Sequence, residues 1–223
     1  PRFTPNIQAL QSMAYDLEEQ EQIESLKHWW RDNGNVVTWV AIVVLLAVAG
    51  WFGWKNWQRK QAGEASVLYE QVQKAVDGKD AEKIKRAATD MEDKFGGTAY
   101  AQMTALAAAK ALYEANDVAS AKAQLQWTVD HARDDEYKAL AKLRLAGLLL
   151  DEKAYDQGIA LVSGDVAPAF AGLYADRRGD LLAAQNKNEE ARAAYKLALE
   201  KFGPADASAR QIVQFKLDAL GGA

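Results

Sequence analysis

The hydrophobic pattern divides the chain into a mixed polar start, an apolar run and a long remainder with helical periodicity. Residues 36–54 read VVTWVAIVVLLAVAGWFGW and carry no charged side chain. As an α-helix rising about 1.5 Å per residue, they would span roughly 28 Å, close to the roughly 30 Å hydrocarbon core of a bilayer. The pattern therefore predicts a transmembrane helix, which we place at residues 36–57.

Tryptophan flanks the apolar run on both sides. Six of the seven tryptophans lie there, at Trp29, Trp30, Trp39, Trp51, Trp54 and Trp57. Amphipathic indole rings favour the headgroup region, so we expect Trp39, Trp51, Trp54 and Trp57 to mark the membrane interfaces. Ten Val, Ile, Leu or Phe residues in the run contribute on the order of −3 to −6 kcal/mol to insertion. The alternative is a buried core helix, for which the aromatic belt has no explanation.

The span is interpreted as an uncleaved signal anchor. Residues 47–49 have the small-x-small form of a cleavage site, but the acidic run DLEEQE precedes them where a signal peptide carries positive charge. The orientation stays open from charge alone. The nearest basic residues are two before the run and three after it: Lys27, Arg31, Lys55, Arg59 and Lys60. This excess of one charge would keep the following domain in the cytoplasm, yet long domains can translocate regardless of such a bias.

Residues 1–35 form the segment before the span. Within residues 14–32, Ile23, Leu26 and Trp30 share one helical face while carboxylates occupy the others. The pattern predicts a short amphipathic helix closed by Asn33 and Gly34, because glycine tolerates the left-handed conformation of a C-cap. Such a helix leads into the membrane; a docking or degradation signal is the alternative. Met13 resembles a natural start, and residues 1–12 are interpreted as an extension without a structural role.

Residues 58–223 contain internal repeats of helical hairpins. Short Gly, Asp and Asn clusters interrupt an alanine-rich helical pattern, and the absence of sustained period-two alternation argues against strands. Three segments repeat small, large, small and large residues at offsets of 0, 3, 12 and 16: Ala109, Leu112, Ala121 and Leu125; Ala146, Leu149, Gly158 and Val162; Gly179, Leu182, Ala191 and Tyr195. Their first positions lie 37 and 33 residues apart, on either side of the 34-residue tetratricopeptide period.

Close helix crossing explains this pattern. Gly or Ala lets the two helices of a hairpin approach, while the larger residues fill the space to the next hairpin, and stacking buries both faces. Residues 62–95 would form an earlier hairpin with a degenerate signature, and residues 207–220 a capping helix. The predicted fold class is all-α: a single transmembrane helix followed by a tetratricopeptide-like helical-hairpin solenoid. An alanine-rich antiparallel bundle is the alternative.

Catalytic and cofactor chemistry finds no support in the sequence. Cysteine is absent and only two histidines occur, and no phosphate loop, HExxH or GxSxG motif is present. His131 lies beside a charged turn and is interpreted as a surface residue. A net charge of −4 without a clustered basic patch argues against nucleic-acid binding. We therefore expect no enzyme, no metal and no cofactor.

A protein-binding groove is the remaining candidate site. In tetratricopeptide stacks the first helix of each unit lines the concave face through positions 2, 5, 9 and 12. Those positions give Met103, Leu106, Lys110, Tyr113, Leu140, Leu143, Leu150, Leu173 and Asp176. An exposed apolar groove of this kind would bind an extended chain or a partner's helix. The alternative is that these residues pack under a neighbouring helix as core.

The chain resembles the YfgM family of bacterial inner-membrane proteins, which are ancillary subunits of the Sec translocon. The resemblance runs from about Tyr15 to the C-terminus, and residues 1–12 have no counterpart in it. It rests on the leader EEQEQIESLKHWWRDNG, the span ending GWFGWKNW, the following QAGEASVLYEQV and the repeat GDLLAAQNKNEEARAAYKLAL. The leader and the span are its specific parts, since the repeats alone indicate only a large superfamily.

The resemblance implies a function and a location. The N-terminus would be cytoplasmic and the repeat domain periplasmic, in the inner membrane beside SecYEG. There the domain would assist newly translocated proteins in a chaperone-like role, together with the membrane-anchored chaperone PpiD. The alternative function is a tetratricopeptide scaffold for envelope assembly or cell division complexes, which differs in its partners rather than its architecture.

Overall fold

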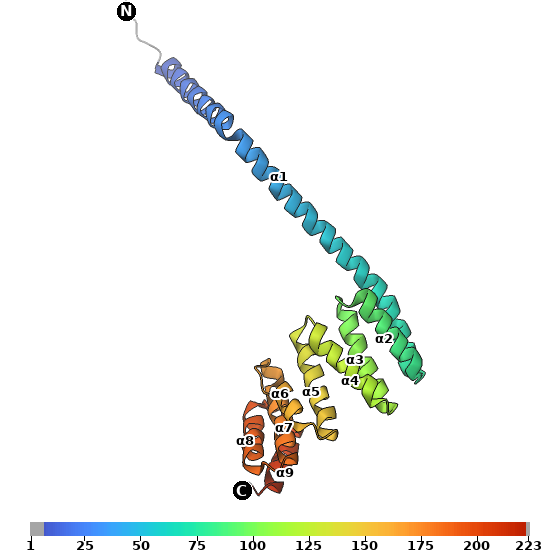
Figure 1. The fold of residues 1–223 in the computed structure, drawn as a ribbon. Coiled ribbons are helices and arrows are strands. Elements are labelled where there is room, and N and C mark those ends of the chain that lie inside the picture. Colours follow the sequence, from blue (N-terminus) through green and yellow to red (C-terminus); the bar gives the residue numbers. More distant parts are fainter. Residues whose placement is uncertain (1–6, 222–223) are drawn as a thin grey trace, which may run out of the picture. The chain divides into compact units, whose positions relative to one another are not determined.

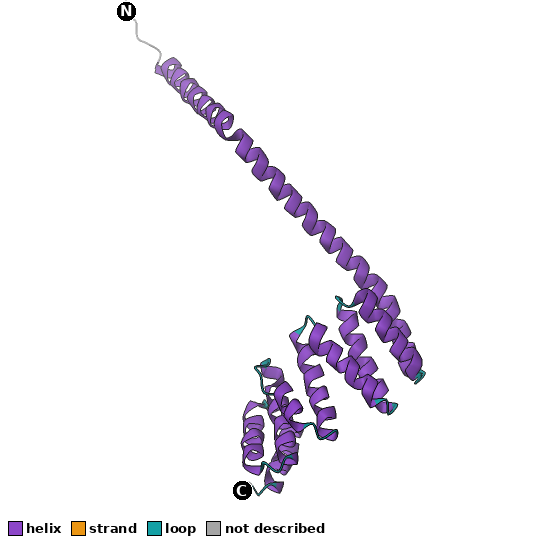
Figure 2. Ribbon diagram, viewed as in Figure 1, coloured by secondary structure: helices purple, strands orange, loops and turns teal. Residues whose placement is uncertain are grey.

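The computed structural model describes the backbone of residues 7–221 and the side chains of residues 23–221, and all regular structure within them is helical (Figure 2). The described elements are α1 (Ile7–Asp77), α2 (Ala81–Phe95), α3 (Ala99–Glu114), α4 (Val118–His131), α5 (Asp135–Asp151), α6 (Tyr155–Leu161), α7 (Pro168–Ala184), α8 (Asn188–Lys201), the 3-10 turn η1 (Pro204–Asp206) and α9 (Ala207–Ala219). Contacts divide the chain into two units, Pro1–Gln58 and Arg59–Ala223. Helix α1 runs from one unit into the other.

The predicted helix end at Asn33 and Gly34 is wrong, because α1 continues through both residues. Asn33 donates from Nδ2 to the carbonyl of Trp29 at 3.0 Å, a bond within the helix, and Gly34 lacks the positive φ of a left-handed cap. A glycine inside a helix costs only about 1 kcal/mol relative to alanine. The strongly apolar run that follows outweighs this cost. Residues 7–12 also belong to α1, whereas residues 1–6 lie outside the described residues.

The part of α1 in the first unit fits a membrane anchor. It is the one helix among the described residues with the length and composition needed to cross a membrane, and none of its apolar window is buried. The tryptophans that flank the window are open as well, with Trp39 63% and Trp57 52% exposed. Trp54 and Trp57 lie 5.2 Å apart between ring centroids. Apolar and indole side chains bare on every side are unfavourable in water and suited to lipid.

The second unit is a stack of helical hairpins that follow one another in chain order (Figure 1). The C-terminal part of α1 pairs with α2 through Ala65 and Met91, which are both fully buried. Helices α3 with α4, α5 with α6, and α7 with α8 form the next hairpins. Helix α9 packs on the last of them through Val213 and Leu217. The predicted fold of stacked, paired helices is confirmed.

One turn geometry repeats in every hairpin. Two residues after the end of each first helix stands a non-glycine residue with a φ between 51° and 64°: Lys79, Asn116, Lys153 and Asn186. The N–H of the residue after each of them donates to a carbonyl five residues earlier, as from Asp117 to Leu112 at 2.8 Å, which is a Schellman-type cap. The four positions lie 37, 37 and 33 residues apart. The first hairpin shares this turn, so it is a repeat unit although its signature is degenerate.

The signature residues form the core of the stack as predicted. All members of the three repeated sets are buried, and Leu112, Ala121, Ala146 and Ala191 are among the most enclosed. The small members allow close crossings. A Cβ added at Gly179 would lie 2.4 Å from the ring of Tyr195, and one added at Gly158 would lie 2.8 Å from Leu181. Both distances are shorter than ordinary Cβ contacts, so a larger residue at either position would have to displace the neighbouring side chain.

Candidate protein-binding pocket

The four groove positions predicted on α3 divide between core and surface. Leu106 is 6% exposed and belongs to a core cluster with residues from α1 to α5. It is therefore a core residue and does not line a groove. Met103 is half-buried. Lys110 and Tyr113, one turn further along α3, are exposed and free to contact a partner.

The predicted positions on α5 and α7 are all half-buried. These leucines pack against three different clusters of buried residues. Leu140 contacts the cluster that contains Leu106. Leu143 and Leu150 contact the cluster around Leu181, and Leu173 contacts the cluster around Tyr195. Their side chains therefore serve partly to join successive hairpins. Asp176 lies in a polar network and not in an apolar groove. As a set, these nine residues do not share one cavity.

A pocket of about 460 Å³ lies instead where α3, α5 and α7 face one another. Helices α3 and α4 contribute Ala109, Lys110, Tyr113 and Leu125. Helices α5 and α7 contribute Arg144, Gly147, Leu148, Asp151 and Arg177. We call it the α3–α5–α7 pocket. Two of its lining residues, Lys110 and Tyr113, were predicted, whereas the others are not among the predicted groove positions.

The repeat pattern of the sequence also marks Arg144 and Arg177, which the predicted groove positions do not include. Arg144 and Arg177 lie 33 residues apart and each stands two residues before the small residue that opens its signature, Ala146 or Gly179. They therefore occupy the same position in successive units. The groove positions taken from the general tetratricopeptide pattern skip this one, although it faces the pocket in both units.

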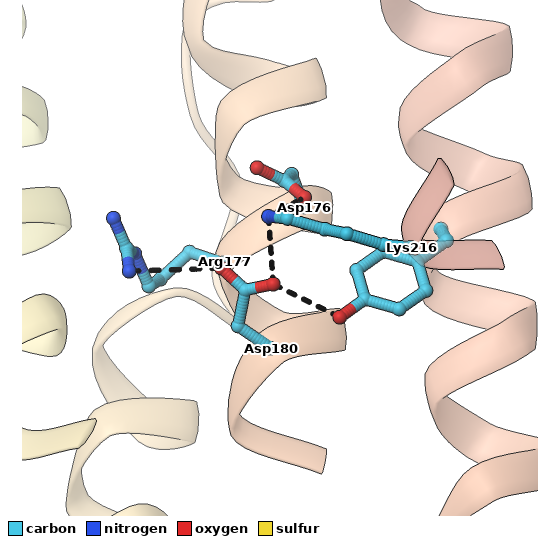
Figure 3. A network of polar contacts seen from close by, with 5 residues as sticks. Asp176, Arg177, Asp180 and Lys216 are labelled. Carbon is cyan, nitrogen blue, oxygen red and sulfur yellow. Dashed lines mark hydrogen bonds and ion pairs between the residues drawn. The ribbon is translucent and has the colours of Figure 1, made fainter. Parts of the chain in front are cut away.

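A network of charged groups fixes α7 against the capping helix (Figure 3). Lys216 of α9 contacts both Asp176 and Asp180 of α7 at 2.7 Å. The hydroxyl of Tyr195 donates to the same Oδ1 of Asp180 at 2.9 Å. Arg177 extends from the other side of Asp180, with Nη1 3.6 Å from Oδ2. Burial raises the pKa of the Asp176 carboxyl, and Lys216 acts in the opposite direction.

Replacing Lys216 by methionine is expected to destabilise the repeat unit increasingly as the pH rises. The native pKa of Asp176 lies above its ordinary value of 3.8, so the folded state binds more protons there and stability falls as pH rises through that window. Without Lys216 this pKa rises further, and two neighbouring carboxylates lack their shared cation. We expect a loss of about 1–3 kcal/mol at pH 7.5, below that of a fully buried pair because water reaches these groups, and little loss near pH 4.

Urea unfolding of the two proteins at several pH values measures this effect. Lys196→Met is the matched control, because Lys196 is exposed and carries the same charge without an ion pair in the described part of the chain. It should leave stability within about 0.5 kcal/mol of the original protein. Equal losses for both variants at every pH would contradict the role given to Lys216.

Comparison with known proteins identifies the family to which this architecture belongs. The model of the tetratricopeptide repeat-like domain family matches residues 27–222. A protein of Neisseria gonorrhoeae is 32% identical over 93% of this chain and 100% of its own length. A protein of Haemophilus influenzae is 26% identical with the same coverage, and one of Escherichia coli is 26% identical over 82% of this chain and 87% of its own length. All three are named ancillary SecYEG translocon subunit.

The fold defines the class of protein. A helix that fits a membrane anchor precedes a tetratricopeptide-like stack, which is an architecture for contacts between proteins. The chain belongs to the family of ancillary SecYEG translocon subunits, as the resemblance to the YfgM family predicted.

Proposed function

We propose that this chain is a membrane-anchored protein-binding subunit that associates with the SecYEG translocon and assists newly translocated proteins in a chaperone-like role, together with PpiD. The observation that carries the proposal is the match to the Neisseria gonorrhoeae translocon subunit over 93% of this chain and all of that protein. The match spans the anchor and the repeats alike. Retention of both parts supports a function that needs a repeat domain held beside a membrane.

The structure supports action by contact. The repeat unit offers a pocket of about 460 Å³ on the side where successive first helices face one another. Chaperone-like work requires reversible contact with a chain, and an open recess between rigid helices provides a surface for it.

Co-purification from membranes tests the association. The full chain, tagged at its C-terminus and extracted in a mild detergent, should recover SecYEG subunits and PpiD at a constant ratio. A version that keeps residues 1–58 but carries an unrelated soluble domain is the control for retention by the anchor alone. Recovery of envelope-assembly or division proteins without channel subunits would overturn the proposal in favour of a scaffold.

The proposed orientation places the N-terminus in the cytoplasm and residues 61–223 in the periplasm. The side after the span has one basic residue more than the side before it. This excess alone would favour the opposite orientation, but a long domain can translocate despite such a bias. Protease added to spheroplasts should therefore digest residues 61–223 while a cytoplasmic marker stays intact. Protection of these residues until the membrane is dissolved would contradict the orientation and, with it, a role on translocated chains.

A further inference from the structure

The α3–α5–α7 pocket is cationic on a protein that is acidic as a whole. The chain carries a net charge of −4, yet the pocket is lined by Lys110, Arg144 and Arg177 against one carboxylate, Asp151. The charges come from three successive units of chain, so they gather through folding and not through a run of basic sequence. A local excess of this kind attracts an anionic group.

The two arginines are poorly satisfied by the protein itself. A guanidinium offers five N–H donors, but the described contact of Arg144 is a long bond of 3.4 Å from Nη1 to the carbonyl of Leu106. Arg177 faces Asp180 at 3.6 Å, which is beyond hydrogen-bond distance. Its Nε is buried without a partner in the described part of the chain. Both side chains therefore keep donors for a ligand.

Asp180 balances Arg177 only in part, because it shares its charge with a second cation and accepts a hydrogen bond from Tyr195. Its Oδ1 accepts from Lys216 at 2.7 Å and from the hydroxyl of Tyr195 at 2.9 Å. These contacts keep the carboxylate on the side of the capping helix, whereas the guanidinium of Arg177 points away from Lys216 (Figure 3). The capping network thus leaves the positive charge of Arg177 directed toward α5 and the pocket.

The pocket also has room and apolar walls beside the charges. Gly147 has no side chain, and the Arg177 guanidinium lies across it, 3.7 Å from where a Cβ would stand. The ring of Tyr113 is 48% exposed on α3. Leu148, a core residue that is 8% exposed, lines the pocket on α5 one helical turn from Arg144. A ligand that fits this arrangement carries an anionic group next to an apolar one.

We propose that the pocket binds an acidic segment of a partner protein, by placing an Asp or Glu carboxylate between Arg144 and Arg177 and a neighbouring apolar side chain against Tyr113 and Leu148. This inference rests on the proposed function, since it names the chemistry of the chain that the repeat unit contacts. Arginine and a carboxylate form short, paired hydrogen bonds, and these are stronger in a recess than in open water. Asp151 also lines the pocket and repels a second anion, so the site takes a single carboxylate.

Two labelled dodecapeptides test the proposal, one alternating Glu and Phe and the other alternating Gln and Phe. The full chain is used in nanodiscs of neutral lipid, and binding is followed by fluorescence anisotropy. We expect the Glu peptide to bind at least tenfold more tightly than the Gln peptide, which corresponds to about 1.4 kcal/mol. The difference should shrink as salt rises from about 0.05 to 0.5 M.

Arg144→Gln combined with Arg177→Gln should reduce affinity for the Glu peptide by about tenfold or more, since it removes the charge-assisted bonds. Arg86→Gln combined with Arg178→Gln is the matched control, because it removes the same charge from exposed positions outside the pocket. Gly147→Leu is a second variant that keeps every charge and fills the space beside the Arg177 guanidinium, so it tests whether the pocket must be open for the peptide to bind. It should lower affinity as well.

Equal binding of the Glu and Gln peptides, or unchanged affinity in both pocket variants, would overturn the proposal. So would transfer of binding to vesicles of anionic lipid with no preference between peptides, because the cations would then serve a membrane surface. The outcome of the peptide experiment does not depend on whether the chain associates with SecYEG. A chain that discriminates the peptides but does not recover SecYEG would retain this site and lose the proposed association, whereas the reverse result would retain the association and remove the site.

Discussion

Replacing Gly179 by valine is expected to lower the thermal unfolding midpoint of the repeat unit by roughly 2–12 °C. A Cβ at this position would lie 2.4 Å and 2.5 Å from two ring carbons of Tyr195, and valine adds two further methyl groups. Overpacking of a core costs typically 1–3 kcal/mol and sometimes more, and each kcal/mol shifts the midpoint of a unit of this size by about 2–4 °C. Far-ultraviolet circular dichroism of the full chain in detergent measures the midpoint.

The loss should exceed a simple steric cost. The ring of Tyr195 cannot move aside alone, because its hydroxyl is bonded to Asp180, which also holds Lys216 of the capping helix. Displacement of the ring therefore disturbs the contact between α7, α8 and α9 together. We expect the last hairpin and the cap to lose protection from amide hydrogen exchange before α3 and α4 do.

Gly164→Val is the matched control for this substitution. Gly164 lies in the connection between α6 and α7, a Cβ there would meet nothing within 4 Å, and its φ is not in the left-handed region. The midpoint should stay within about 2 °C of the original protein, as for an ordinary surface change. Equal shifts in the two variants would show that the crossing at Gly179 is not tight.

The repeat fold could be predicted because its determinants are local and periodic. Alternation of small and large residues at Ala146, Leu149, Gly158 and Val162 follows directly from two helices crossing closely. The turns were also readable, since Asn116 and Asn186 suit the left-handed position that ends each first helix. Lys79 and Lys153 take the same conformation without that preference, so tertiary packing imposes the turn there.

The continuity of α1 could not be predicted from capping rules alone. Asn33 and Gly34 are typical of a helix end, and the sequence on both sides has helical character. Which tendency prevails depends on the balance between a small cost at glycine and the helical preference of the apolar residues that follow. That balance favours continuation, and the ring of Trp30 packs 3.3 Å from where a Cβ of Gly34 would lie.

The pocket could be predicted only in part because its cations come from separate units. Lys110 was found from its repeat position, but Arg144 and Arg177 occupy a position that the general pattern does not assign to the concave face. Their convergence depends on the crossing geometry of α5 and α7. The burial of Leu106 likewise depends on how the helices of neighbouring hairpins pack around it, which repeat offsets do not specify.

Placing arginine at both Leu45 and Leu46 is expected to remove the chain from the membrane. The ten Val, Ile, Leu and Phe residues of the span contribute on the order of −3 to −6 kcal/mol to insertion, while each arginine near its centre costs about 2.5–3.5 kcal/mol. Two arginines also remove the contribution of two leucines, so the sum becomes positive. After alkaline extraction, the variant should be found in the soluble fraction or be degraded, whereas the original chain sediments with membranes.

Gln211→Arg combined with Gln214→Arg is the control for added charge. Both glutamines are exposed on α9 in the repeat unit, so the same two charges there should leave membrane sedimentation unchanged. The comparison separates insertion from electrostatic attraction to lipid, because attraction would increase in both variants alike. If the Leu45 and Leu46 variant still resisted alkaline extraction, residues 36–57 would not be the segment that holds this chain in the bilayer. The bare apolar surface of α1 would then need a protein partner to cover it.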